Sequence, residues 1–256
     1  MIRIGTSGFS YADWVGPVYP EDLSDREQLS YYARMFPTVE LNVTYYRVPD
    51  TRIVEGWVRK TPDDFLFAVK AYKGLTHERE TPEFAPFVES LAPLVEAGKL
   101  GCVLAQFPNS FRPVPENVAY LSRLREGLGE LPAVVEFRNA AWANDETYET
   151  LDGLNLGFCC VDEPRLRGLM PPVAVATDGI GYVRFHGRNA AKWYNHDEAW
   201  ERYDYTYSVE ELEEWAPRLR ELDARTPLTL VYFNNHFQGQ SVRGARDLGQ
   251  LLLGLD

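Results

Sequence analysis

The stretch GCVLAQ at residues 101–106 decides the fold, because it is a short apolar run that ends in a polar residue and similar runs recur along the chain. Short β-branched or aromatic runs that alternate with longer amphipathic segments are typical of repeated βα units around a parallel sheet. We count eight such runs, near residues 2–6, 39–42, 65–70, 101–106, 134–137, 157–161, 182–186 and 229–233. Eight strands in 256 residues predict an α/β fold, a single (β/α)8 barrel of the TIM type with parallel strands.

Amphipathic segments between the strands predict helices near residues 26–36, 51–60, 84–97, 116–126, 145–151, 209–222 and 241–253. Only the link after the sixth strand lacks a clear helix. Ser208 and Glu211 fit a capping box at the start of one helix. Residues 163–179 and 187–207 are predicted to be long loops, since the first holds three prolines and the second is rich in Trp, Tyr and Asn. The second loop follows the seventh strand and should hang over the barrel mouth.

A doubly wound open sheet is the alternative architecture. It usually carries a glycine-rich turn with the spacing GxGxxG after its first strand. The segment GTSG at residues 5–8 lacks that spacing, so we prefer the barrel. No internal repeat, linker or low-complexity tract marks a boundary, and residues 1–256 are expected to form one domain.

Composition narrows the choice of partners and compartment. The 38 acidic residues outnumber the 26 basic ones, giving a net charge of −12, so a nucleic-acid partner is unlikely without a local basic patch. No apolar window reaches the roughly 18 residues of a membrane helix and the N-terminus shows no secretory pattern, which predicts a cytoplasmic protein without a membrane partner. Cys102, Cys159 and Cys160 have no CxxC spacing and are predicted to be reduced core residues.

Polar side chains mark the ends of most of the predicted strands. Active sites of such barrels are assembled at these ends and in the loops that follow them. Side chains alternate along a strand, so we predict that three pairs point into the barrel: Glu40 with Asn42, Glu136 with Arg138, and Arg184 with His186. The alternative is a hydrogen-bonded network with a purely structural role, because every buried polar group needs a partner.

Glu40, Glu136 and His186 are the predicted catalytic residues. The two carboxylates would form an acid/base pair if the mouth keeps one ionised and the other neutral, with His186 as a further proton carrier. The alternative is that Glu136 has no catalytic role and is only neutralised by a basic neighbour such as Arg138. A divalent metal held by these residues and Asp162 is a weaker possibility, since no HExxH or similar motif supports it. No metal ligand or cofactor is therefore predicted.

Four basic residues, Lys70, Arg138, Arg184 and Arg188, predict a positive cluster at the mouth of an otherwise acidic protein. Such a cluster suits a small anionic ligand that carries a carboxylate or phosphate. Internal salt bridges to the nearby carboxylates are the alternative. The strand ends predict the following substrate-binding residues: Ser7, Asn42, Lys70, Gln106, Arg138, Asp162, Arg184, Asn234 and Asn235.

Blocks that contain these same residues resemble the YecE-like family, domain of unknown function 72. They are GTSGFSY at 5–11, VELN at 39–42, FAVK at 67–70, QFP at 106–108, VEFR at 135–138, the single Asp162, RFHG at 184–187 and YFNN at 232–235. Each block is short, but their order over nearly the whole chain makes a chance match improbable. The resemblance implies a TIM barrel with a pocket at these blocks and adds His77 and Tyr232 to the binding residues, but it brings no established reaction. Phe9 stands where Trp is expected, and residues 188–205 are harder to match, so substrate-specific differences are expected there.

Three functions follow from these observations. The first is an enzyme of hydrolase-like type that uses Glu40, Glu136 or His186 for proton transfer on a small anionic substrate. The second is a metal-dependent phosphodiesterase or nuclease, suggested by analogy with other barrels that are lined by carboxylates and histidines. The third is a non-catalytic protein that binds a small molecule.

Overall fold

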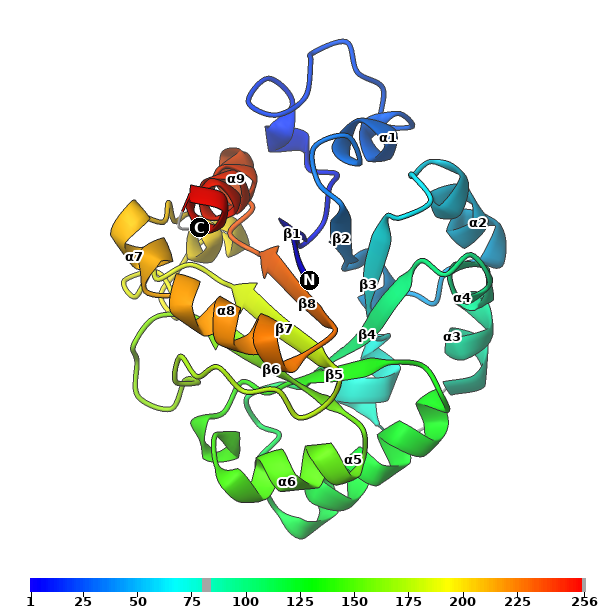
Figure 1. The fold of residues 1–256 in the computed structure, drawn as a ribbon, viewed down its shortest axis with the longest axis vertical. Helices are drawn as coiled ribbons and strands as arrows, with labels where there is room; N and C mark the ends of the chain where they lie inside the picture. Colours follow the sequence, from blue (N-terminus) through cyan, green and yellow to red (C-terminus); the bar gives the residue numbers. More distant parts are fainter. Residues whose placement is uncertain (80–83, 255–256) are drawn as a thin grey trace.

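Eight parallel strands form one sheet that curls into a nearly closed barrel (Figure 1). The computed structural model describes residues 1–79 and 84–254. The strands are β1 Ile2–Thr6, β2 Thr38–Leu41, β3 Leu66–Lys70, β4 Leu100–Gln106, β5 Ala133–Glu136, β6 Gly157–Asp162, β7 Ile180–Phe185 and β8 Leu228–Phe233. Their order is β1-β8-β7-β6-β5-β4-β3-β2, so consecutive strands are neighbours all the way round. The predicted parallel barrel of eight strands is confirmed.

The barrel closes where β1 meets β2. Ser7 and Glu40 form a parallel bridge there, and the Gly8 amide donates to the Glu40 carbonyl oxygen at 2.7 Å. Tyr32 spans the same seam, since its hydroxyl accepts from the Thr6 amide at 2.8 Å and donates to a β2 carbonyl oxygen at 3.1 Å. The strands approach so closely that a Cβ added at Gly5 would lie 2.2 Å from that carbonyl oxygen. Glycine at position 5 therefore allows the ring to close.

Helices lie outside the ring of strands (Figure 1). They are α1 Gln28–Tyr32, α2 Thr51–Arg59, α3 Phe84–Ser90, α4 Ala92–Glu96, α5 Pro115–Leu128, α6 Asp145–Gly153, α7 Val209–Glu213, α8 Ala216–Arg225 and α9 Gln240–Gly254. Short single-turn elements follow several strand ends: η1 Ala12–Trp14, η2 Val43–Tyr45, η3 Gly74–Glu78, η4 Ala140–Trp142, η5 Ala199–Tyr203 and η6 Phe237–Gly239. The capping box of Ser208 and Glu211 is present at the start of α7, and the link between β6 and β7 contains no helix, as predicted.

Three predicted helices differ from the structure. The segment 84–97 is divided into α3 and α4, and 209–222 into α7 and α8. Pro93 and Pro217 lie in the first turns of α4 and α8, where a residue without an amide hydrogen is tolerated, so the chain starts a new helix at each. The segment 26–36 contains only the five-residue α1, with turns on both sides. Hydrophobic periodicity continued across these breaks and did not reveal them.

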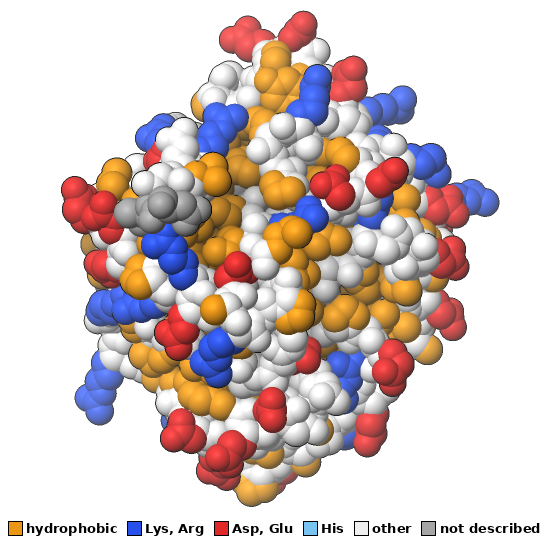
Figure 2. All heavy atoms as spheres, viewed as in Figure 1, with side chains coloured by type: hydrophobic (Ala, Val, Ile, Leu, Met, Phe, Trp, Pro, Cys, Tyr) orange, Lys and Arg blue, Asp and Glu red, His pale blue; other side chains and the backbone are white. Residues whose placement is uncertain are grey.

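The barrel interior is unusually polar for a core, because it contains charged and tyrosine side chains in addition to aliphatic ones. Glu40, Glu136, Arg184, Tyr182 and Tyr232 are all at most 1% exposed. The three cysteines are buried and unpaired, as predicted. No helix among the described residues is long and apolar enough to cross a membrane. Figure 2 shows acidic and basic side chains interspersed over one face of the molecule.

Candidate functional site

A buried guanidinium joins two carboxylates at the C-terminal end of the barrel. The Nη1 of Arg184 donates to Glu136 Oε2 at 2.5 Å, and its Nη2 donates to Glu40 Oε1 at 2.7 Å. The hydroxyl of Tyr182 donates to the second oxygen of Glu40 at 2.7 Å. Strands β2, β5 and β7 thus each contribute an inward side chain, as the alternation along each strand predicted.

The second oxygen of Glu136 extends the network toward the mouth. It forms an ion pair with Arg138, whose Nε is 2.8 Å away, and lies 2.9 Å from His186 Nε2. The other ring nitrogen of His186, Nδ1, is 3.1 Å from the side-chain amide nitrogen of Asn234. Burial and the charge of Arg138 lower the pKa of His186 to about 3, so the ring is neutral. The contacts then assign its proton to Nε2, with Nδ1 accepting from Asn234.

Glu136 is ionised despite its burial. Burial alone would raise the pKa of this carboxyl, but Arg138, Arg184 and His186 together hold it well below its ordinary value. Burial would likewise lower the pKa of Arg184, but Glu136 and Glu40 hold it well above its ordinary value. The cluster is therefore a set of buried charges that compensate one another, and removal of one partner would leave the others uncompensated.

A cavity of about 660 Å³ opens above this cluster. Its polar wall residues include Asn42, Lys70, Gln106, Arg138, Arg184, Asn234 and His236, and its aromatic ones include Phe9, Tyr11, Tyr45, Tyr46 and Tyr203. Among the described residues that line this mouth cavity there are three cationic side chains, Lys70, Arg138 and Arg184, and no carboxylate. Glu40, Glu136 and His186 are not part of the wall and lie beneath it.

Lys70 is the least constrained of the three cations. Its Nζ lies 4.6 Å from the centroid of the Tyr45 ring, and no hydrogen bond or ion pair of this nitrogen occurs among the described residues. Burial and the charges of Arg184 and Arg138 lower the pKa of Lys70 to about 7, although Glu136 and Glu40 oppose the shift. The amine is therefore partly neutral near pH 7.

A second hollow of about 420 Å³ adjoins the mouth cavity, with which it shares Gln106, Arg138 and Tyr203. Its wall includes Trp193, which lies in the long loop after β7, and Glu163, which follows β6. Glu163 was not among the residues predicted from the sequence.

The side chain of Glu163 is fully buried and incompletely partnered. One oxygen accepts from the Met170 amide at 2.8 Å, while the other has no hydrogen bond and lies 3.8 Å from Arg138 Nη1. Burial raises the pKa of Glu163 to about 7, although Arg138 opposes the shift. Such a carboxyl can donate or accept a proton near neutral pH.

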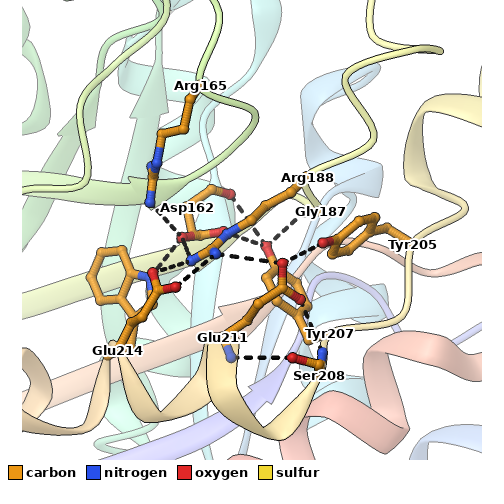
Figure 3. Close-up of polar contacts among 10 residues, drawn as sticks. Asp162, Arg165, Gly187, Arg188, Tyr205, Tyr207, Ser208, Glu211 and Glu214 are labelled. Carbon is orange, nitrogen blue, oxygen red and sulfur yellow. Dashed lines mark hydrogen bonds and ion pairs between the residues drawn. The ribbon is translucent and has the colours of Figure 1, made fainter.

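Asp162, which the sequence placed in the mouth, points to the opposite face of β6 (Figure 3). Its two oxygens accept from Arg188 Nε and Nη2, each at 2.8 Å, from the Tyr207 hydroxyl at 2.8 Å and from the Trp215 indole at 2.7 Å. Arg188 also reaches Glu214 Oε2 at 2.9 Å. Asp162 and Arg188 therefore tie the loop after β7 to α7 and α8, and neither lines the mouth cavity.

The alternation along β6 explains why position 163 was missed. Cys160 faces outward, where its sulfur meets the Val175 backbone, and Asp162 shares that face. Positions 159, 161 and 163 consequently share the inward face. The signal was present in the sequence, but Asp162 was selected because it directly follows the predicted strand at residues 157–161.

The remaining predicted residues lie around the site without lining the mouth cavity. Tyr232 is deep in the barrel, where its hydroxyl lies 2.6 Å from Thr38 Oγ1. Asn235 donates to the Tyr205 carbonyl at 2.7 Å, and Ser7 Oγ is buried without a hydrogen bond. His77 packs edge-on against the Tyr45 ring, and burial and Lys70 lower its pKa to about 4.

The aromatic residues of the cavity wall were not among the predicted binding residues, and two of them contact His236. Tyr11 stacks on His236 with their ring centroids 4.3 Å apart, and Tyr203 lies 5.3 Å from the same imidazole. Tyr11 belongs to the GTSGFSY block, and His236 directly follows YFNN, so their positions next to conspicuous strand ends could have found them. Tyr203 lies in the long loop after β7, and nothing in its local sequence marks it.

The described residues contain no group of three or more His, Cys, Asp and Glu side chains placed to hold a metal ion. The inward carboxylates Glu40 and Glu136 both bind the Arg184 guanidinium. The arrangement is suited to holding arginines in fixed positions under a cavity.

Comparison with known proteins agrees with the fold. The family model described as "Protein of unknown function DUF72" matches residues 3–254. The chain is 38% identical to the UPF0759 protein YunF of Bacillus subtilis (strain 168), over 98% of this chain and 95% of that protein. It is 31% identical to the UPF0759 protein YecE of Escherichia coli (strain K12), over 59% of this chain and 54% of that protein.

Two solved structures are similar over almost their whole length. A DUF72 family protein from Thermotoga maritima MSB8 is 42% identical with a TM-score of 0.91, and the match covers 99% of each chain. A DUF72 family protein from Enterococcus faecalis V583 is 30% identical with a TM-score of 0.88, over 99% of this chain and 96% of that chain.

Proposed function

Since this chain belongs to the DUF72 family, whose description names no reaction, we propose from its own site that it is an enzyme acting on a small phosphate- or carboxylate-bearing molecule bound in the barrel mouth. The observation that carries the proposal is the set of basic side chains, without a carboxylate, on the cavity wall. Three cationic side chains and no carboxylate line it among the described residues, in a protein of net charge −12. An anion is the ligand that such a wall binds best.

The size of the cavity supports a small molecule. A volume of about 660 Å³ lies within the roughly 300–1,000 Å³ range of small-molecule sites. Its wall combines aromatic rings with a few polar groups, as small-molecule sites do. Asn42 Oδ1 is buried there without a hydrogen bond, so it can accept one from a ligand hydroxyl or amine.

The buried network below the cavity has a positioning role in this proposal. Glu40 and Glu136 hold Arg184 rigidly, and Glu136 also holds Arg138. His186 is neutral and engaged at both ring nitrogens. Proton transfer, which the sequence assigned to these buried residues, falls to groups that line the two hollows and titrate near neutral pH.

Lys70 and Glu163 are those groups. The pKa values of both lie near 7, and each is incompletely partnered within the described part of the chain. Enzymes commonly shift a lysine or carboxyl toward neutral pH by burial when that group must transfer a proton. Lys70 and Glu163 line adjoining hollows that share Arg138, so both hollows open onto the same guanidinium.

Thermal unfolding in inorganic phosphate tests the anion site. A phosphate concentration of ten times the Kd stabilises the fold by about 1.4 kcal/mol, which raises the Tm by roughly 3–5 °C for a chain of this size. Arg138→Gln should reduce that rise, whereas Arg47→Gln, which removes an exposed arginine outside the cavity, should leave it unchanged. A wild-type Tm that phosphate does not raise, or an equal rise in the Arg138 variant, contradicts the proposal.

A further inference from the structure

Lys70 is placed differently from the other lysines of the chain. It ends β3 and lines the mouth cavity, with a tyrosine ring as its nearest described partner. Lys73 and Lys192 each form an ion pair at 2.6 Å, and Lys99 donates to two backbone carbonyl oxygens at 2.8 and 3.0 Å. Lys60 is exposed at the C-terminal end of α2. Lys70 alone combines access to a cavity with an amine that has no described hydrogen-bond partner.

The neighbours of Lys70 favour the neutral form of its amine. Arg184 and Arg138 already supply two permanent positive charges to the same wall, and both are fixed by Glu136. Burial lowers the pKa of the amine, and the two guanidiniums lower it further because a third fixed cation beside them is electrostatically unfavourable. Glu136 and Glu40 act against this lowering of the pKa, but both carboxylates already form ion pairs with the arginines.

We propose that Lys70 is a nucleophile that forms a Schiff base with the carbonyl group of a small phosphate- or carboxylate-bearing compound. The proposal rests on the anion site above: Arg138 and Arg184 bind the anionic group, and Lys70 attacks a carbonyl carbon of the same molecule. A lysine amine beside other cations in a desolvated pocket is activated in this way.

The covalent step balances with solvent as the source of one proton. The neutral amine nitrogen bonds to the carbonyl carbon, and the π electron pair of the carbonyl moves to its oxygen. That oxygen takes one proton from the nitrogen and a second from solvent, then leaves as water. The product is a protonated imine, so one amine, one carbonyl compound and one proton yield one iminium ion and one water.

Reductive trapping tests the proposal. The protein is incubated at pH 7 with dihydroxyacetone phosphate or pyruvate and sodium cyanoborohydride, which reduces an imine to a stable secondary amine, and adducts are located by peptide mass spectrometry. At pH 7 about half of an amine with a pKa near 7 is neutral, against fewer than one in a thousand for an ordinary lysine. We expect adducts to form on the order of a hundredfold faster at Lys70 than at Lys73, which is three residues away and partly exposed.

Matched variants and probes separate this proposal from the anion site. Lys70→Arg keeps a positive charge but should abolish the adduct, whereas Lys73→Arg should trap at the wild-type rate. Dihydroxyacetone lacks the phosphate, so it should label Lys70 at least tenfold more slowly than dihydroxyacetone phosphate if the arginines bind the anion. Equal labelling by the two probes supports the nucleophile and contradicts the anion site. Labelling of Lys70 no faster than Lys73, in a protein whose Tm phosphate raises, overturns the Schiff base and leaves the anion site standing.

A second readout does not depend on the carbonyl compound. Competitive acetylation of the lysines with trace acetic anhydride, measured between pH 6 and 10, reports the ionisation of each amine. The reactivity of Lys70 should level off near pH 7–8, while that of Lys73 continues to rise, since an ion pair with Glu78 raises its pKa. The charged or titratable groups around Lys70 are Arg184, Arg138, Glu136, Glu40, His77 and Tyr45, and substitutions of these that refold should shift the curve. A Lys70 profile that follows that of Lys73 contradicts the proposal.

Discussion

Glu163→Gln should make the protein more stable at alkaline pH, because it replaces a buried ionisable carboxyl with a neutral side chain of the same shape. The Glu163 carboxyl has no exposed surface, and one of its oxygens has no hydrogen bond. Glutamine keeps an oxygen that can accept from the Met170 amide. The substitution therefore removes the titration and leaves the packing unchanged.

The magnitude follows from the pKa of Glu163, which is raised from 4.5 to about 7. The folded protein retains a proton that the unfolded chain releases, so this contribution to stability is complete below pH 4.5 and is lost as the pH rises through 7. At about 1.4 kcal/mol for each pH unit between the two pKa values, the loss amounts to about 3 kcal/mol by pH 8. The variant should not show this loss.

Urea denaturation at several pH values between 4.5 and 8 measures the effect, in buffers without phosphate. The difference in free energy of unfolding between variant and wild type should be near zero at pH 4.5 and rise by about 3 kcal/mol by pH 8. Glu89→Gln, which changes an exposed carboxyl on α3, is the control and should show no such trend. A Glu163→Gln difference that stays constant with pH would refute the raised pKa and, with it, the proposed proton-transfer role of Glu163.

Three further substitutions test other parts of the structure. Arg184→Gln should reduce stability by roughly 3–5 kcal/mol in urea titrations, because it leaves the buried carboxylates of Glu40 and Glu136 uncompensated; a loss below about 1 kcal/mol would contradict the charge network. Gly5→Ala should reduce stability by about 1–3 kcal/mol, because the added methyl group would lie 2.2 Å from a β2 carbonyl oxygen. An unchanged urea midpoint would show that β1 and β2 pack less closely than described. Asp162→Asn should weaken the attachment of residues 187–207 to α7 and α8 and speed limited proteolysis within that loop; cleavage at the wild-type rate would argue that other contacts hold it.

The strands and their order could be predicted from the sequence because each is a short apolar run with a polar end, and a parallel barrel leaves little freedom in their arrangement. The same regularity placed Glu40, Glu136, Arg184 and His186 together, since alternation decides which side chains face inward. The helix breaks at Pro93 and Pro217 were not predicted because hydrophobic periodicity alone does not detect them.

The sequence could not predict which residues of the site line the cavity and which lie beneath it. Whether an inward carboxylate lines the cavity or lies beneath it depends on the depth of each strand in the barrel and on the loops above, as Glu136 and Glu163 illustrate. Asp162 and Glu163 point in opposite directions because side chains alternate along the extended chain, so a one-residue difference in which position is selected changes the face. Tyr203 reaches the cavity because hydrogen bonds and ion pairs on the outside of β6 hold its loop in place. These contacts join residues far apart in the chain, so the sequence near Tyr203 does not reveal them.

The direct test of the account is the position of a bound oxyanion. Crystals grown without sulfate or phosphate are soaked in selenate, a sulfate analogue, and anomalous scattering locates the selenium atoms. We expect the strongest peak in the mouth cavity, with selenate oxygens within hydrogen-bond distance of Arg138 and Arg184 and close to Lys70. Selenate bound only at surface sites, with the mouth cavity free of it, would contradict the claim that this barrel binds an anionic substrate.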